Sequence, residues 1–222
     1  MDRWRGNADK ILIMKPIFII LGVAGLFILI LIMTAIGSYN GLARSSQAVD
    51  NEWGQVQTVY QRRNDLIPNL VATVSGAANF EKSTLIAVTD ARASVGKTTI
   101  NANSAPTDPA ALQQFEQAQQ NLSGALSRLL VVVEKYPDLK SNVSFLALQA
   151  QLEGTENRIS VERGNFNDAV QAYNSRVVSF PSMIMAHLGG FTTKPYFQAA
   201  PTAATAPQVQ FDFSGSTTAP AH

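Results

Sequence analysis

The chain has 222 residues and a formal net charge of +1, and charged residues make up only 15% of it. Nucleic-acid binders neutralise phosphates with a basic excess, so this charge balance argues against nucleic acid as a partner. The absence of cysteine excludes structural disulfides, thiolate nucleophiles and cysteine-based metal sites.

The chain begins with a short basic tail, residues 1–16, followed by an apolar run without a charge. An uncharged run of about 20 residues matches the hydrocarbon core of a bilayer when it is helical. Residues 17–37 are therefore interpreted as a transmembrane helix. Its anchor positions include Ile17, Phe18, Leu21, Phe27, Leu31 and Ile36. A cleaved signal peptide is the alternative, because Ala35 and Gly37 fit a small-x-small cleavage rule, but its apolar run is typically shorter.

The charges around the span predict its orientation. Basic residues cluster before it, and only Arg44 follows closely. The positive-inside rule therefore places the short N-terminus in the cytoplasm and the body of the protein on the other side.

Residues 41–95 have the pattern of two helices. Apolar residues alternate steps of three and four, with a gap at Arg63, where the pattern calls for a buried apolar side chain. Pro68 lacks the N–H that would bond to the carbonyl of Asn64, so a kink is predicted there. Gly76 is expected to end the first helix, and a shorter helix is predicted over residues 79–94.

A polar loop over residues 96–108 leads into the next predicted helix. Asp108 is a good N-cap and Pro109 suits the first helical position. An apolar three-four stripe then continues to Tyr136, where Pro137 stops it. A short turn follows, so this helix and the next should be antiparallel neighbours.

Residues 141–180 have the pattern of one long helix. Apolar residues recur there at seven-residue steps and are predicted to form a buried stripe, namely Phe145, Leu152, Ile159, Phe166, Tyr173 and Phe180. The companion positions include Glu156 and Arg163. Together with Arg63, they suggest a buried or half-buried layer in which Glu156 pairs with an arginine of the first bundle helix. The candidate layer comprises Arg62, Arg63, Asp65, Glu156 and Arg163. The alternative is that Glu156 and Arg163 lie at the flank with their charged ends in water.

The C-terminal part is apolar and then rich in Pro, Ala and Thr. Residues 182–197 either fold back on the bundle or form a surface for another subunit or the bilayer. Residues 198–222 form the tail, in which residues 209–213 alternate like a strand. A lone strand needs a partner, which suggests a homo-oligomer. The candidate interaction residues are Met183, Ile184, Leu188, Phe191, Tyr196, Phe197, Phe211 and Phe213.

Residues 62–71 read RRNDLIPNLV and resemble the RRxDLIPNLV signature of the LemA family of bacterial membrane-anchored helical proteins. Further similarity includes Tyr39-Asn40, Trp53, Ala91-Arg92, residues 136–140, residues 152–159, Arg163, Phe166-Asn167, Tyr173-Asn174, Phe180-Pro181, Gly190-Phe191 and Tyr196-Phe197. The family more often has Tyr-Asn at the position of Phe166-Asn167. The resemblance implies a membrane-tethered antiparallel helical bundle and supplies no catalytic residues.

The predicted fold is all-α: an N-terminal transmembrane helix followed by an elongated antiparallel up-and-down bundle of three to four long helices over residues 41–197, with a short extended C-terminal segment. No histidine, second carboxylate or nucleophile is spaced to make a catalytic or metal site, because His187 is isolated and His222 is the last residue. No cofactor is expected.

Two functions remain open at this point. The first is a non-enzymatic scaffold or assembly protein in the bacterial cell (inner) membrane. Its expected partners are the lipid bilayer, further copies of the chain, and other membrane or envelope proteins. The second is an enzyme or signalling component that uses the polar layer near Arg63, Glu156 and Arg163.

Overall fold

The computed structural model describes the backbone of residues 5–77, 80–97 and 104–198, with side chains from Ile19 onward. Within these ranges the chain is all-helical and contains no strand, which confirms the predicted fold class. The helices are α1 (Arg5–Ser75), α2 (Lys82–Lys97), α3 (Pro109–Val133), α4 (Pro137–Lys140), α5 (Val143–Val178) and α6 (Ser182–Gly189). The strand-like residues 209–213 lie outside the described part of the chain.

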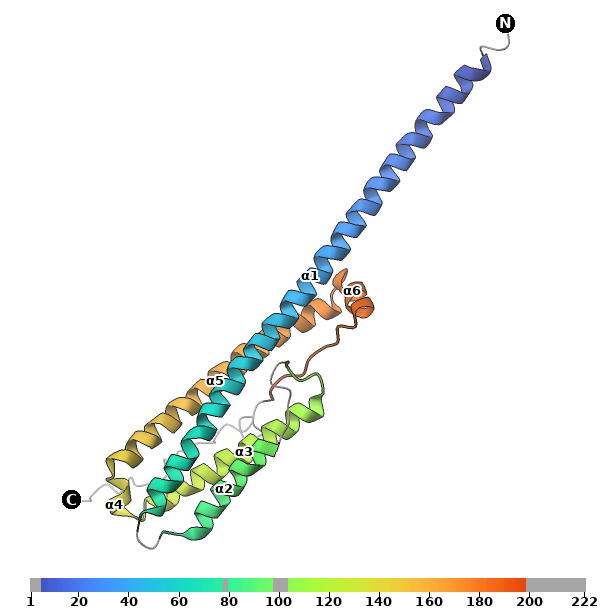
Figure 1. Cartoon of the computed structure of the whole chain (residues 1–222). Helices are drawn as coiled ribbons and strands as arrows, with labels where there is room; N and C mark the ends of the chain where they lie inside the picture. Colours follow the sequence, from blue (N-terminus) through green and yellow to red (C-terminus); the bar gives the residue numbers. More distant parts are fainter. Residues whose placement is uncertain (1–4, 78–79, 98–103, 199–222) are drawn as a thin grey trace, which may run out of the picture.

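The four longer helices form an antiparallel up-and-down bundle (Figure 1). α5 packs along α1, and α3 packs along α2. α4 is a single turn that joins α3 to α5 at the end of the bundle far from the N-terminus, whereas α6 lies at the opposite end, beside α1. This is the arrangement that short connections between long amphipathic helices predict.

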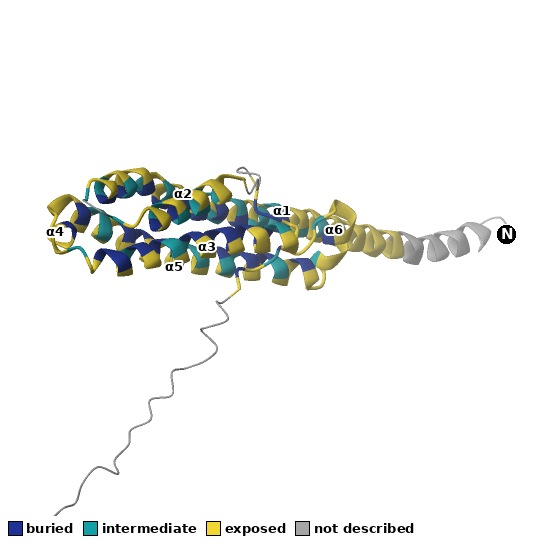
Figure 2. Ribbon diagram, turned by 90° about the horizontal axis from the view of Figure 1, so that it is seen from below, coloured by how far each residue is buried: buried dark blue, intermediate teal, exposed yellow. Residues whose placement is uncertain are grey.

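α1 is one uninterrupted helix of 71 residues. The sequence separates a membrane segment ending at Gly37 from a bundle beginning at Gly41, but the structure joins them without a loop. Within the described residues, α1 is the one helix long and apolar enough to cross a membrane. Its first half projects from the bundle, and the anchor residues Leu21 and Phe27 are exposed, as lipid-facing side chains would be (Figures 1 and 2). The side chains of Ile17 and Phe18 lie outside the described part.

The long helix α5 buries most of the predicted seven-residue series. Phe145, Leu152, Ile159, Phe166 and Tyr173 are buried against the bundle. The prediction was wrong for Phe180, whose side chain is 77% exposed. The reason is that α5 ends at Val178, before Pro181, so Phe180 no longer follows the helical repeat that keeps its predecessors on the inner face.

The helix starts follow from local chemistry. The Asp108 carboxylate accepts a hydrogen bond from the Ala110 N–H, and Pro109 takes the first position of α3, as predicted. At the start of α5, the Asn142 side chain accepts from the N–H groups of Ser144 and Phe145. These caps define where the two helices begin.

α1 continues through Pro68 without a break (Figure 1). Pro68 has no N–H that could donate to the carbonyl of Asn64. Arg92 of α2 supplies the missing donor, because the Nε of Arg92 donates to the Asn64 oxygen over 3.3 Å. The missing donor in α1 therefore becomes a link between α1 and α2. This link also explains why an arginine is useful at position 92.

This substitution of donors can be tested with a double-mutant cycle. Arg92→Met removes the donor while keeping an unbranched apolar stem, and should lower the free energy of unfolding by about 1 kcal/mol. In a Pro68→Ala background the loss should nearly vanish, because the new N–H at position 68 can satisfy the Asn64 carbonyl within α1. Urea unfolding of the full-length protein in detergent, followed by circular dichroism, measures both.

The matched control is Arg158→Met, which removes an exposed arginine from α5 and should have little effect in either background. The proposed coupling would be contradicted if Arg92→Met lowered the free energy of unfolding by the same amount in the natural chain and in the Pro68→Ala variant.

Candidate functional site

Arg63 is the charged side chain most deeply placed in the described bundle, with 2% of its surface exposed. It lies on the inner face of α1, between Tyr60 and Ile67. Those two residues belong to different apolar clusters, one built around Trp53 and the other around Leu122 and Leu129. Arg63 therefore marks a polar layer that divides the hydrophobic core in two.

One guanidinium group connects three helices at this layer. Its Nη1 donates to Ser123 Oγ of α3 over 2.8 Å and to Glu156 Oε2 of α5 over 2.9 Å. Its Nη2 donates to the side-chain oxygen of Gln119, and lies 3.4 Å from the backbone oxygen of that residue. A buried guanidinium requires such acceptors, because removing its charge from water without them costs several kcal/mol.

Two further features describe the environment of Arg63. Its Cζ lies 5.1 Å from the centre of the Tyr60 ring, a cation–π distance. Its Nε is buried and has no hydrogen-bond partner within the described residues. Burial also raises the pKa of the Tyr60 hydroxyl, an effect that the nearby Arg163 and Arg63 charges oppose.

Glu156 completes the layer from the outside. Its side chain is 56% exposed, whereas that of Arg63 is 2% exposed, so the ion pair joins a buried cation to a carboxylate at the bundle surface. The layer is thus half-buried. This arrangement makes the two partners unequal, because water can solvate Glu156 without Arg63 but cannot easily solvate Arg63 without Glu156.

Arg163 belongs to a second polar cluster. Its Nη2 lies 2.9 Å from Glu116 Oε1 of α3 and donates to the backbone oxygen of Gln198 over 2.9 Å. The Gln198 N–H donates to the same Glu116 oxygen over 3.2 Å. Seven residues separate Arg163 from Glu156, which is about 10.5 Å along the helix. The structure therefore divides the single predicted layer into two.

Glu116 is part of this second cluster and was missed by sequence reasoning. Burial raises the pKa of its carboxyl above the ordinary value, while the Arg163 guanidinium opposes part of the shift. The sequence did carry one signal for the polar residues of α3. In the apolar stripe of α3, Gln119 lies between Phe115 and Leu122, at a position where the spacing predicts an apolar side chain.

A third polar cluster holds residues 191–198, here called the C-terminal strap. Lys194, 7% exposed, pairs with Asp50 of α1 over 2.8 Å. The side-chain amide of Asn174 donates to the Lys194 oxygen and accepts from its N–H, both over 2.8 Å. Asn167 makes the equivalent pair of bonds to Phe197. Two asparagines seven residues apart on α5 thus bind an extended chain through its backbone.

The strap also corrects one predicted surface residue. Phe197 is buried, because its ring packs against Trp53 and Phe166 with centroid separations of 6.1 and 5.3 Å. Phe191 is partly buried against Tyr39. By contrast, the side chains of Met183, Ile184, Leu188 and Tyr196 are exposed. Phe211 and Phe213 lie outside the described residues.

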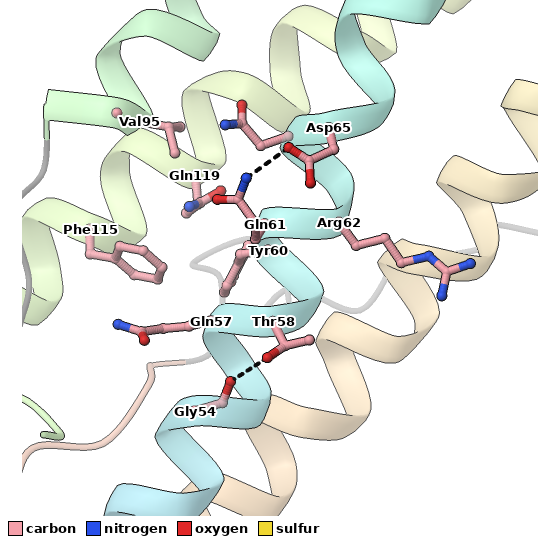
Figure 3. A pocket seen from close by; sticks show the side chains of 12 residues that line it. Gly54, Gln57, Thr58, Tyr60, Gln61, Arg62, Asp65, Val95, Phe115 and Gln119 are labelled. Carbon is pink, nitrogen blue, oxygen red and sulfur yellow. Dashed lines mark hydrogen bonds between the residues drawn. The ribbon is translucent and has the colours of Figure 1, made fainter. Parts of the chain in front are cut away.

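A cleft of about 700 Å³ opens between α1, α2 and α3, next to the Arg63 layer. Its lining includes Tyr60, Gln61 and Gln119, and Gln61 Nε2 donates to Asp65 Oδ1 over 2.7 Å (Figure 3). Arg62 extends away from Phe115 and Gln119 in this view. Arg62 and Asp65 are therefore exposed residues at the cleft and are not members of the buried layer.

The cleft and the polar clusters are built from amides, hydroxyls and paired charges. Within the described ranges, no group of three or more His, Cys, Asp or Glu residues could hold a metal ion. The charges at Arg63, Arg163 and Lys194 are all bound to acceptors from other segments of the bundle. This arrangement links α1, α3, α5 and the strap to one another.

Three comparisons with known proteins bear on this region. The family model described as LemA family matches residues 52–211, which include Arg63, Glu156 and Arg163. The magnetosome proteins MamQ 1 and MamQ 2 of Paramagnetospirillum magneticum are each 25% identical over 209 residues, covering 86% of this chain and 75% of the relative. Protein LemA of Metamycoplasma hominis is 25% identical over 161 residues, 69% of each chain.

The unequal burial of Arg63 and Glu156 leads to a prediction about their substitution. Glu156→Ala leaves a buried guanidinium without its counterion, and should lower the free energy of unfolding by about 3 kcal/mol. Arg63→Met fills the same space and leaves a carboxylate that water can solvate, and should cost only about 1 kcal/mol. Urea unfolding of the full-length protein gives both values.

In the Arg63→Met background, Glu156→Ala should hardly change the free energy of unfolding, because the buried charge is gone. Glu134→Ala is the matched control, since Glu134 forms an exposed ion pair with Lys140 and should change stability by less than about 1 kcal/mol. A larger loss for Arg63→Met than for Glu156→Ala would show that the guanidinium is a net source of stability.

Proposed function

Since this chain belongs to the LemA family and is a membrane-associated helical protein, we propose that it is a non-enzymatic scaffold of the bacterial envelope. It is anchored by a single helix in the cell (inner) membrane and acts through self-association or through membrane partners. The N-terminal tail lies in the cytoplasm, and the bundle lies on the other side of the membrane.

The observation that carries this proposal is the continuity of α1. The helix passes from the apolar segment into the bundle core without a loop or a linker. The 39 helical steps from Ile36 to Ser75 measure roughly 59 Å at about 1.5 Å per residue. A rigid connection of this kind transmits the orientation of the span to the bundle, so the bundle surface is presented at a set height and direction.

The polar clusters support the same reading. Arg63, Arg163 and Lys194 each bind acceptors contributed by a different helix or by the strap. Glu156 is exposed, but its Oε2 is bound to Arg63. The charges proposed for the enzymatic alternative are thus engaged in packing, and the names of the relatives describe a magnetosome protein and a family member without naming a reaction.

Mass determination of the full-length protein tests the scaffold proposal. Purified in mild detergent and examined across a concentration range, it should have a mass of several 23.9 kDa chains, or should carry co-purified membrane proteins identifiable by mass spectrometry. A lone 23.9 kDa chain at every concentration, without a protein partner, would contradict the proposal. A small molecule retained by such a monomer would favour the enzymatic alternative.

Cysteine labelling in intact cells tests the orientation. The natural chain has no cysteine, so Val143→Cys, at the exposed start of α5, provides a unique thiol. A membrane-impermeant maleimide should label it in intact cells, whereas Asn7→Cys in the basic tail should react only after the membrane is disrupted. The reverse pattern would place the bundle in the cytoplasm.

A further inference from the structure

α6 lies where α1 leaves the predicted membrane segment. The ring of Phe191, just after α6, packs against Tyr39 of α1 with centroids 5.5 Å apart. Tyr39 is three residues beyond Ile36, the last of the predicted anchor residues, which is about 4.5 Å along the helix. α6 and the end of the apolar span are therefore at nearly the same height (Figure 1).

The outward face of this end of the bundle is apolar. Within α6, Ala186 is buried and Met185 is partly buried, so the helix already has an inner face. Its exposed side chains are Met183, Ile184 and Leu188, which are large and apolar, and His187; Phe180, two residues before the helix, is also exposed. The exposed fractions are 77% for Phe180, 50% for Met183, 51% for Ile184 and 75% for Leu188. His187 is the one polar side chain among the exposed positions of α6, whereas a helix that faced water on this side would be mainly polar there.

The charges nearby are basic. Residues 36–49 and 169–198 contain no acidic side chain, whereas Arg44 and Arg176 are exposed in these ranges. Arg176 approaches α1 at Gly41, where an added Cβ would lie 2.9 Å from its Nη1. Cations beside an apolar surface match the anionic headgroups and acyl chains of a bilayer interface.

From these observations we propose that α6 is embedded in the bilayer interface, in the leaflet from which α1 emerges. This inference rests on the proposed membrane span. Phe180, Met183, Ile184 and Leu188 enter the boundary between headgroups and acyl chains, while Arg44 and Arg176 face the headgroup phosphates. The protein then contacts the membrane at two places, a span and an interfacial helix.

A second contact has a mechanical consequence. A single span can rotate about its own axis, but a helix fixed beside it in the interface restricts that rotation and the tilt of α1. Since α1 is continuous, the same restriction applies to the bundle. α6 thus sets the direction in which the cleft and the α2–α3 face point relative to the membrane.

A second copy of the chain is a poorer occupant of this surface. Stable protein interfaces bury about 1,200–2,000 Å², and the exposed face of α6 consists of one eight-residue helix. Its position beside the end of the span instead makes it continuous with the lipid-facing surface of α1. At this position the exposed face of α6 would meet lipid.

Depth measurements with spin labels test the proposal. Leu188→Cys and Ile184→Cys are labelled separately in the full-length protein, which is reconstituted into phosphatidylethanolamine and phosphatidylglycerol vesicles. Their collision rate with oxygen relative to a water-soluble nickel complex should be several-fold higher than that of the same label at Val143→Cys, which lies at the far end of the bundle. Equal ratios at all three positions would overturn the proposal.

Phe27→Cys, inside the predicted span, separates this proposal from the one on which it rests. A lipid-like ratio at Phe27→Cys with a water-like ratio at Leu188→Cys overturns the α6 inference alone. A water-like ratio at Phe27→Cys overturns the membrane span, and the α6 inference with it.

A helical insertion provides the decisive variant. Seven residues of sequence AEAAKAA placed between Ser38 and Tyr39 leave the Tyr39–Phe191 contact in place but should move α6 about 10.5 Å away from the span. The label at Leu188→Cys should then become water-accessible, while Phe27→Cys is unchanged. A label that stays protected, with spin–spin broadening that disappears on dilution with unlabelled protein, would assign the surface to a second copy and overturn the lipid proposal.

Discussion

The desolvation of Arg63 is the constraint on which the rest of the bundle depends. A guanidinium with 2% of its surface exposed needs acceptors within hydrogen-bond distance, and it finds them on α3 and α5 at once. Sliding either helix along α1 would remove its acceptors, at a cost that apolar contacts alone do not impose. The core is rich in aromatic side chains on one side of Arg63 and mainly aliphatic on the other. The directional hydrogen bonds of the polar layer between them favour one register of the helices.

The backbone of the strap, like the Arg63 side chain, depends on hydrogen-bond partners from other segments. Residues 191–198 form no helix or strand, so their backbone groups need partners from elsewhere. Asn167 and Asn174 supply these as paired donors and acceptors, and Lys194 adds an ion pair to Asp50 of α1. The strap consequently ties the segment that follows α6 to α1 and α5. Phe197, inserted beside Trp53, makes the strap part of the core.

These features describe a molecule in which one continuous helix runs from the apolar segment to the far end of the bundle. α1 provides the axis. The clusters at Arg63 and Lys194 hold α3, α5 and the strap to it, the cluster at Arg163 joins α3, α5 and the strap to one another, and α6 lies beside α1 where the apolar segment ends. A protein built in this way is suited to hold surfaces at a set distance and direction. The proposed scaffold role rests on the continuity of α1, and the proposed interfacial role of α6 rests on its exposed apolar side chains beside the end of the apolar segment.

The sequence by itself determined the elements and their direction. Seven-residue spacing along residues 141–180, the Asp108-Pro109 start and the apolar run before Gly37 are local signals, because periodicity, capping and bilayer thickness act on neighbouring residues. They predicted the antiparallel all-helical bundle and its anchor, and the irregular positions at Arg63 and Pro68. The exposed Phe180 was mispredicted because a periodic pattern does not show where a helix stops.

Tertiary structure alone decided the partners. The acceptor for Arg163 is Glu116 and that for Lys194 is Asp50, pairs separated by 47 and 144 residues along the chain. No local pattern encodes such pairs, since they depend on which helix faces meet after packing. The same holds for Arg92, which satisfies a carbonyl that Pro68 leaves open. It also holds for Phe197, for which the sequence left open whether the segment folds back on the bundle or forms an interaction surface. The polar residues were visible as irregularities in the sequence, but only the packed bundle shows what each of them binds.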